Sequence, residues 1–274
     1  MNLVWASLIV VATTALAVAA MLLVRRNAPE GSRFKDGDRA SGVFGVLATG
    51  FSVLLGFVVF LGFESYDESR SGAEQEALVL SQQVETAQFL GAPGRTLTGE
   101  LVCYGRSVIH LEWPRAESGT EGDGVNPWGV RMFRTFQAFE PKTASEQAAY
   151  GKWMDETSDR EAARIDRIHG AVGVIPLPLW VVLLLISVVV FVFMLFFADS
   201  GEGAVTQAVL MGSVTTVLVS MLLLITFLDS PFHKGVGGVR PVAMERTLRM
   251  VDQALQDVGV RLNLPCDAQG NPVP

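Results

Sequence analysis

The chain has 274 residues, of which half are hydrophobic and 18% are charged, and 21 basic against 28 acidic residues give a net charge of −7. Soluble domains usually contain about a quarter charged residues, so this composition argues against a purely cytosolic globule. The same hydrophobicity excludes disorder for most of the chain. Without a basic tract, nucleic acid is not expected as a partner, because phosphate binding needs clustered Lys and Arg.

Four stretches of the chain are long and apolar enough to cross a lipid bilayer. They contain no Lys, Arg, Asp or Glu, and they cover residues 3–24, 43–63, 177–197 and 204–228. A helix needs about 20 apolar residues to cross the hydrocarbon core, and lipid offers no partner to an open backbone. We therefore predict an all-α membrane protein with four transmembrane helices. The first stretch lacks a positively charged start, so a retained anchor is expected rather than a signal peptide.

The spans divide the chain into four expected regions. Residues 1–63 would hold the first two spans and a short basic loop, 64–173 a helical extramembrane domain, 174–228 the last two spans, and 229–274 an extramembrane tail. Four crossings place the N-terminus, the long segment and the tail on one face of the membrane. Both short connections then lie on the other face.

The charges near the spans give two opposing indications of orientation. The first short connection carries the basic residues Arg25, Arg26, Arg33, Lys35 and Arg39. The positive-inside rule would place this connection in the cytoplasm and the long segment outside. The opposite face also has basic residues close to the spans, namely Arg160, Arg164, Arg167, Lys234, Arg240 and Arg246.

The extramembrane segments are predicted to be helical. Apolar residues recur every three or four positions between 73 and 90, so the second span is expected to continue as an amphipathic helix up to the Ala-Pro-Gly sequence at 92–94. A helix over 97–112 would end at Pro114, and a glycine-rich loop would follow at 115–127.

Two further helices are expected closer to the C-terminus. Thr143 or Ser145 is expected to open a helix reaching about residue 168, and Glu146, three residues after Thr143, gives a capping-box pattern. An apolar stripe over 239–260 indicates a last amphipathic helix in the tail.

No enzyme motif is present, and neither a catalytic residue, a cofactor nor a resident metal is expected. The glycines at 235–238 follow a membrane span rather than a strand, which excludes a dinucleotide-binding loop. His169 and His233 flank the third and fourth spans on one membrane face, where they could form an interfacial metal or proton-sensing site with Asp166 or Asp229. The simpler interpretation is that both histidines are ordinary hydrogen-bond partners.

The two cysteines, Cys103 and Cys266, lie on the same face of the membrane according to the count of spans. If that face is outside the cytoplasm, a disulfide between the tail and the long segment is expected. If it is cytoplasmic, both residues are reduced thiols.

The second span carries two stripes at helical spacing and is followed by acidic residues. Its small residues are Gly45, Thr49, Ser52 and Gly56, and its bulky residues are Leu55, Val59 and Phe63. Small stripes allow close packing of helices in lipid, whereas a ring of apolar side chains around an axis gates ions by dewetting. Glu64, Asp67 and Glu68 come next and would form an acidic mouth that attracts cations.

Three sequence blocks, in the same order and position relative to the spans, resemble the bestrophin family. They are Phe-Leu-Gly-Phe at 60–63 with Ser65-Tyr66, Arg167-Ile168 with Ile-Pro-Leu-Pro-Leu-Trp at 175–180, and Asp-Ser-Pro-Phe at 229–232 with Pro-Val-Ala-Met at 241–244. The chain also resembles the bacterial bestrophin-like membrane proteins. This resemblance implies a pentamer in the bacterial inner membrane, a pore lined by the second span, and a helical vestibule with both termini in the cytoplasm.

The resemblance suggests two alternative registers for the pore neck. Aligning the first block implies Leu55, Val59 and Phe63, whereas a second Leu-Gly-Phe at 55–57 implies Thr49, Val53 and Phe57. The first register is preferred because Ser65-Tyr66 follows it. The chain departs from the family pattern in two places: Glu64 replaces a basic residue, and Thr-Phe-Leu at 226–228 replaces an acidic run, so no calcium clasp is expected.

The leading hypothesis is passive conduction of small ions by a homo-oligomer in the lipid bilayer, with a preference for cations. The alternative is a non-conducting scaffold or sensor, whose helical domain recruits a partner through aromatic residues. These are Trp113, Trp128, Phe133, Phe136 and Trp153.

Overall fold

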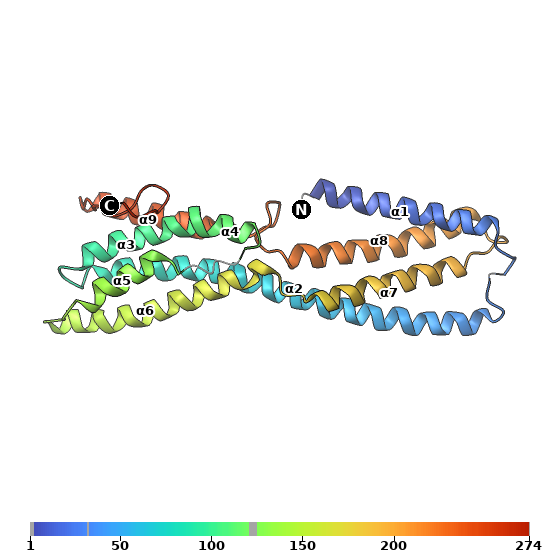
Figure 1. The fold of residues 1–274 in the computed structure, drawn as a ribbon, viewed down its shortest axis with the longest axis horizontal. Coiled ribbons are helices and arrows are strands. Elements are labelled where there is room, and N and C mark those ends of the chain that lie inside the picture. The colour runs from blue at the N-terminus through green and yellow to red at the C-terminus, as the bar shows by residue number, and fades with distance from the viewer. Residues whose placement is uncertain (1–2, 32, 121–124, 274) are drawn as a thin grey trace. The chain divides into compact units, whose positions relative to one another are not determined.

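A computed structural model describes residues 3–31, 33–120 and 125–273, and the secondary structure in this part of the chain is helical, without strands. The helices are α1 Leu3–Arg26, α2 Gly37–Ala87, α3 Gly94–Ser107, α4 Trp113–Glu117, α5 Pro127–Gln137, α6 Ala144–His169, α7 Leu177–Phe196, α8 Ala204–Leu228 and α9 Val242–Asp257 (Figure 1). A π-helical stretch Val108–Glu112 links α3 to α4, and a short 3-10 turn Gly170–Val172 follows α6. The predicted all-α class is confirmed.

The chain forms two compact units. The first comprises Met1–Glu64, Gly173–Asp229 and Lys234–Val236, and the second comprises Ser65–Val172, Ser230–His233 and Gly237–Pro274. Among the described residues, four helices are long and apolar enough to cross a membrane, namely α1, α2, α7 and α8. The predicted spans are therefore confirmed as helices, and α2 runs without a break from the first unit into the second.

In the first unit, α2 packs against α7 and α8 through large apolar side chains. Phe51, Leu55 and Val58 of α2 form a buried cluster with Leu183 of α7 and Ile225 of α8. Helix α1 lies along α8, where the hydroxyls of Thr14 and Thr216 are 3.0 Å apart. These contacts leave large parts of all four helices exposed, as expected for surfaces that meet lipid or another chain.

The two short connections meet at the same end of the first unit (Figure 1). The Arg25 guanidinium donates to the carbonyl oxygens of Glu202 and Ser200 at 3.1 Å, and the Gly31 amide donates to Asp199 at 3.0 Å. The Phe34 ring packs against aromatic rings at the end of α7. The α1–α2 and α7–α8 connections therefore form one structure.

Asp229 joins the opposite ends of α7 and α8. Its carboxylate accepts hydrogen bonds from the amides of Val174 and Ile175 at 2.8 and 2.9 Å. These amides belong to the turn that leads into α7, where Gly173 has a φ of +79°. The aspartate of the Asp-Ser-Pro-Phe block therefore has a structural role, because it satisfies the backbone donors of this turn.

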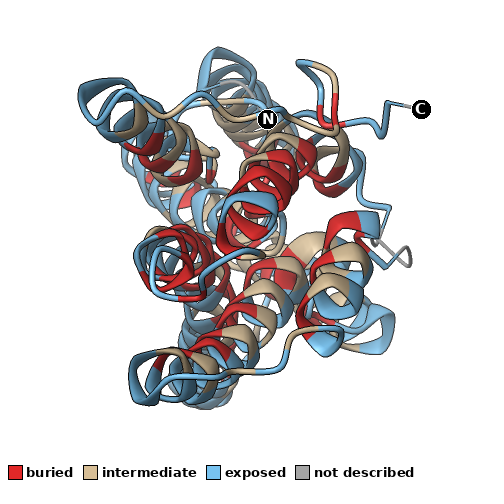
Figure 2. Cartoon of the chain, turned by 90° about the vertical axis from the view of Figure 1, so that its left-hand side faces the viewer, coloured by how far each residue is buried: buried red, intermediate tan, exposed pale blue. Residues whose placement is uncertain are grey.

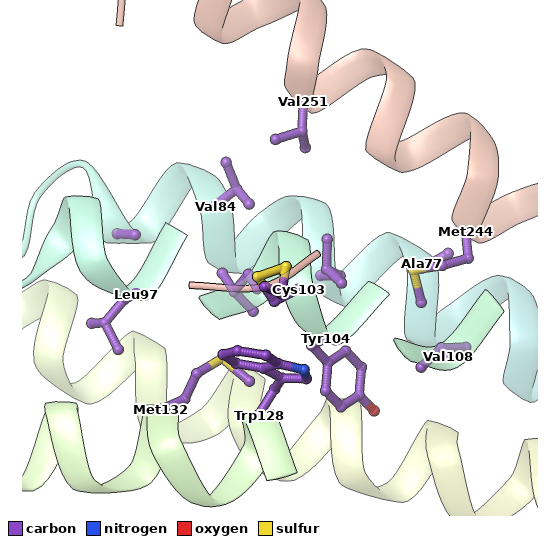
Figure 3. Packing of buried hydrophobic residues seen from close by; sticks show 14 of the residues in the cluster. Ala77, Val84, Leu97, Cys103, Tyr104, Val108, Trp128, Met132, Met244 and Val251 are labelled. Atoms are coloured by element: carbon purple, nitrogen blue, oxygen red, sulfur yellow. A yellow bond between two sulfur atoms is a disulfide. The ribbon is translucent and has the colours of Figure 1, made fainter. Parts of the chain in front are cut away.

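The second unit has a core of aromatic and aliphatic side chains contributed by α2, α3, α5 and α9. Figure 3 shows Tyr104, Trp128 and Met132 packed together in this core. In the end view of Figure 2, buried residues lie on the helix faces that turn inward and exposed residues lie on the outer faces. Trp113, Trp128, Phe136 and Trp153 are all buried, so four of the five aromatic residues considered for partner recruitment belong to the core.

A network of buried charges crosses this core. The Arg167 guanidinium binds the carboxylates of both Glu76 and Glu112, and the Tyr104 hydroxyl donates to Glu76 at 2.6 Å. Arg164 forms a further ion pair with Glu112 at 3.3 Å. Burial alone would raise the pKa of Glu112, but the charges of Arg167 and Arg164 outweigh it and hold this pKa below its ordinary value.

Helices α2 and α6 approach each other at backbone distance beside this network. A Cβ atom on Gly72 would lie 2.4 Å from the Arg167 amide nitrogen and 2.8 Å from the Ala163 carbonyl oxygen. Only glycine fits such a contact without displacing a backbone. The close approach brings the α6 arginines to the α2 carboxylate.

The structure corrects three expectations for the second unit. Pro114 does not end a helix, because the helical backbone continues from the π-helical stretch Val108–Glu112 through Pro114 to Glu117. The expected loop at 115–127 is shorter, since α4 extends to Glu117, and residues 121–124 lie outside the described part. Helix α5 had no predicted counterpart and begins after Asn126, whose side chain caps it. The Thr143–Glu146 capping box of α6 is confirmed.

Replacing Arg167 by alanine should destabilise the second unit by roughly 3–5 kcal/mol, because it leaves buried carboxylates unpaired. The matched control is Arg70→Ala, which removes an ion pair at the surface. In this pair the side chain of Arg70 is 61% exposed and that of Glu74 is 62% exposed. The control substitution should lower the free energy of unfolding by less than about 1 kcal/mol. Thermal unfolding of both variants in the same detergent measures the difference, and equal melting temperatures would contradict the role of the network.

Candidate functional site

The candidate site is the face of α2 that its own chain leaves uncovered. In the first unit this face follows Val46, Gly50, Val53, Phe57 and Phe60, at alternating spacings of four and three residues. Val53 is 69% exposed and Phe57 is 60% exposed. Residues at this spacing lie on one side of a helix, so α2 presents a continuous apolar stripe.

Leu55 does not belong to this exposed stripe. It is only 7% exposed and packs in the cluster with Ile175, Leu183 and Ile225 of its own chain. A residue that fills a core between α2, α7 and α8 is not available to line a pore. The preferred neck register, with Leu55 at its first position, stays a prediction that the burial of Leu55 does not favour.

The other predicted neck residues occupy different environments. Val59 is half-buried against the same cluster as Leu55, whereas Phe63 is exposed. All three residues of the alternative register, Thr49, Val53 and Phe57, are exposed. The alternative register is thus the one whose members share an uncovered face of α2.

The small-residue stripe lies beside the apolar stripe on the uncovered half of α2. Its four members, Gly45, Thr49, Ser52 and Gly56, are all exposed. Cβ atoms on Gly45 and Gly56 would meet nothing within 4 Å. This contrasts with Gly62, where a Cβ would lie 3.1 Å from Leu228 of α8. The chain's own helices therefore pack against Gly62 but leave the small stripe open.

The acidic residues continue the exposed face along α2. Glu64, Asp67 and Glu68 are all exposed, while their neighbours Ser65 and Ser69 are buried. Glu64 follows Phe57 by seven residues and Asp67 follows Phe60 by seven, which corresponds to about two helical turns. Glu64, at the end of the first unit, is therefore in line with the apolar stripe, while Asp67 and Glu68 belong to the second unit.

The two histidines are not part of a metal cluster. Among the residues that the structure describes, no group of three or more His, Cys, Asp or Glu side chains could hold a metal ion. His169 ends α6, and the Nδ1 atom of His233 lies 2.8 Å from the Ser230 carbonyl oxygen. The predicted interfacial site thus gains no third ligand in the described part of the chain.

Cys103 and Cys266 are joined by a disulfide in the structure, with their Cα atoms 5.8 Å apart. The bond connects α3 to the segment after α9 and lies within the core of the second unit (Figure 3). In the same segment, the Gly270 carbonyl oxygen accepts a hydrogen bond from Nε1 of Trp128 at 2.7 Å. The C-terminal segment is therefore attached to the helical core both covalently and through hydrogen bonds.

Comparison with known proteins agrees with this architecture. A family model described as a Bestrophin-like domain matches residues 11–244. A crystal structure of a bacterial bestrophin homologue from Klebsiella pneumoniae has a TM-score of 0.66 at 13% identity, covering 95% of this chain and 100% of that chain. A variant of the same homologue has a TM-score of 0.66 at 12% identity, covering 92% and 99%. No curated protein sequence matches the chain.

The structural likeness, at such low identity, concerns the fold alone, whereas the family match covers most of the sequence, from within α1 to beyond α8. The chain therefore belongs to the Bestrophin-like family and has the fold of the bacterial bestrophin homologues.

Proposed function

We propose that this protein is an ion channel in which several copies, five by resemblance to the bestrophins, surround a pore lined by α2. Family and fold support a membrane protein of the ion-channel type. The observation that carries the proposal is the exposed apolar face of α2 through Val53 and Phe57, which leads at helical spacing to Glu64 and Asp67. We place the channel in the bacterial inner membrane, with the exposed sides of α1, α7 and α8 available to lipid.

The pore neck would be formed by Thr49, Val53 and Phe57. Rings of apolar side chains from several copies leave no hydrogen-bond partners for water, so a narrow neck loses water and limits ion flow. The burial of Leu55 disfavours the other register, because that residue already fills the core of its own chain. The polar Thr49 begins this neck and the bulky Phe57 ends it.

The acidic residues would favour cations at the mouth of the pore. Glu64, Asp67 and Glu68 are exposed along α2, and each copy in a ring would contribute all three. A mouth lined by carboxylates raises the local concentration of cations and repels anions. Conduction would be passive, since the proposal includes no energy source.

The small stripe supplies the contact between copies. Helices in lipid associate closely where glycine, serine and threonine allow their backbones to approach. Gly45, Ser52 and Gly56 lie beside the apolar stripe and are exposed, and Cβ atoms on the two glycines would meet nothing within 4 Å. A neighbouring copy packed against this flank would leave the apolar stripe facing a shared axis.

The non-conducting scaffold finds less support. Its proposed recruiting surface consists of five aromatic residues, of which only Phe133 is exposed. Aromatic residues that fill a core are not available to a partner without unfolding. We therefore do not pursue this alternative.

In mild detergent the protein should form a single species of five chains of 29.5 kDa each. Gly56→Leu should disrupt this assembly, because it places a large side chain on the contact flank without touching its own chain. Val188→Leu, at an exposed position of α7, is the control and should leave assembly intact. Native mass spectrometry measures both, and a monodisperse monomer of the unchanged protein would contradict the proposal.

Phe57→Ala should raise the unitary conductance in planar bilayers about twofold or more, because a shorter side chain widens and wets an apolar neck. Leu55→Ala is the matched control on the buried face of the same helix. It should leave unitary conductance unchanged and lower stability by roughly 2–5 kcal/mol, as core truncations do. The opposite result, with conductance responding to Leu55 and not to Phe57, would restore the register with Leu55, Val59 and Phe63.

Neutralising the mouth with Glu64→Gln, Asp67→Asn and Glu68→Gln should reduce the preference for cations. Removing fixed negative charge lowers the local cation concentration without altering the apolar neck. The reversal potential under a tenfold KCl gradient should therefore move towards zero. An unchanged reversal potential in a conducting variant would show that these residues do not determine selectivity.

A further inference from the structure

We infer that the helical second unit lies on the non-cytoplasmic face of the membrane, where the Cys103–Cys266 disulfide forms. This orientation is the reverse of the one implied by resemblance to the bestrophins. Two separate observations lead to it, namely the disulfide in the second unit and the distribution of basic residues around the first. The inference does not depend on whether the protein conducts ions.

Both cysteines of the chain take part in the disulfide. Cys103 and Cys266 are the two cysteines in the sequence, and no free thiol remains in the structure. Both are buried, with Cys103 on α3 and Cys266 far along the chain in the C-terminal segment. Cytosolic proteins keep their thiols reduced, whereas structural disulfides persist in oxidising compartments outside the cytoplasm.

The segment around Cys266 depends on this link. Beyond α9, which ends at Asp257, the described chain forms no helix, and Cys266 pairs with Pro272 in an isolated bridge. Arg106 donates to the Asp267 carbonyl at 3.1 Å, and a Cβ on Gly270 would lie 2.4 Å from the Ser107 amide nitrogen. This segment packs closely against α3 but has no regular secondary structure. A covalent link to α3 therefore contributes strongly to holding it in place.

Formation of the bond needs an oxidant that the exterior compartment supplies. The two thiols lose two protons and two electrons as the sulfur–sulfur bond forms. An oxidised dithiol carrier of that compartment accepts the electrons by thiol–disulfide exchange, through a mixed disulfide, and leaves as two thiols. The cytoplasm has no comparable net oxidant for a structural disulfide.

The basic residues of the first connection point to the same orientation. Five of them lie between residues 25 and 39, and this connection packs with the α7–α8 connection at one end of the first unit. Short basic loops next to spans stay in the cytoplasm, whereas long segments cross the membrane largely regardless of their charge. The basic residues of the long segment 64–173 therefore contribute less to the orientation. Three of them also bind partners within the folded unit instead of standing free at its surface, namely Arg160, Arg164 and Arg167.

Cysteine labelling in a bacterial host distinguishes the two orientations. In a Cys103→Ser, Cys266→Ser background, single cysteines are introduced as Met250→Cys on α9 and Asn27→Cys in the first connection, both at exposed positions. A membrane-impermeant maleimide, applied to intact cells with a permeabilised outer membrane, should label Met250→Cys at once and Asn27→Cys only after lysis. The reverse pattern would overturn the inference.

Two further measurements do not depend on the fold of the cysteine-free background. A C-terminal alkaline phosphatase fusion of the native chain should be active, because this reporter folds only outside the cytoplasm, and a fluorescent C-terminal GFP fusion would overturn the orientation. In the unmodified protein, cells are lysed directly into denaturant with an alkylating reagent, so that both buried cysteines become accessible. Without prior reduction both cysteines should remain unmodified, and both should react after reduction. Complete alkylation before reduction would overturn the disulfide.

Discussion

The structure depends on one constraint, which is that α2 can bury only one side against its own chain. Phe51, Leu55 and Val58 fill the space between α2, α7 and α8, so these contacts use up that side of the helix. Val53 and Phe57, on the other side, have no covering helix among the described residues of the chain. Lipid or further copies must cover this face.

The second unit relies on charge as well as on apolar packing. Arg167 holds Glu76 of α2 and Glu112 of the π-helical stretch, so it ties together three segments that are distant in sequence. A buried ion pair adds little net stability over a well-packed apolar core, but loss of one member is costly. Together with the backbone contact at Gly72, this network fixes how α2 and α6 pack.

The sequence was sufficient to predict the spans, the class and the family, because long uncharged stretches and ordered motif blocks do not depend on tertiary contacts. It did not reveal which face of α2 is buried, since Leu55 and Phe57 are equally apolar and only the positions of α7 and α8 distinguish them. From the sequence, Arg160, Arg164 and Arg167 are only basic residues close to the spans. Their spacing along one side of α6 was a signal, but their carboxylate partners come from segments whose packing the sequence does not show. Helix α5 has no predicted counterpart, because the expected loop ends at residue 127, where α5 begins, and no element is predicted from there to Thr143.

Fold and membrane orientation are determined by different residues, which is why a family fold can occur with a reversed orientation. The fold rests on contacts such as Gly62 against Leu228 and Asp229 against the amides of the α7 turn. Orientation responds instead to basic residues in short connections, which make few of these contacts. Passive flow through a pore follows the electrochemical gradient in either direction, so reversal does not abolish conduction. It changes which compartment the carboxylates face, and an acidic mouth on the exterior would concentrate cations before they enter the cell rather than before they leave it.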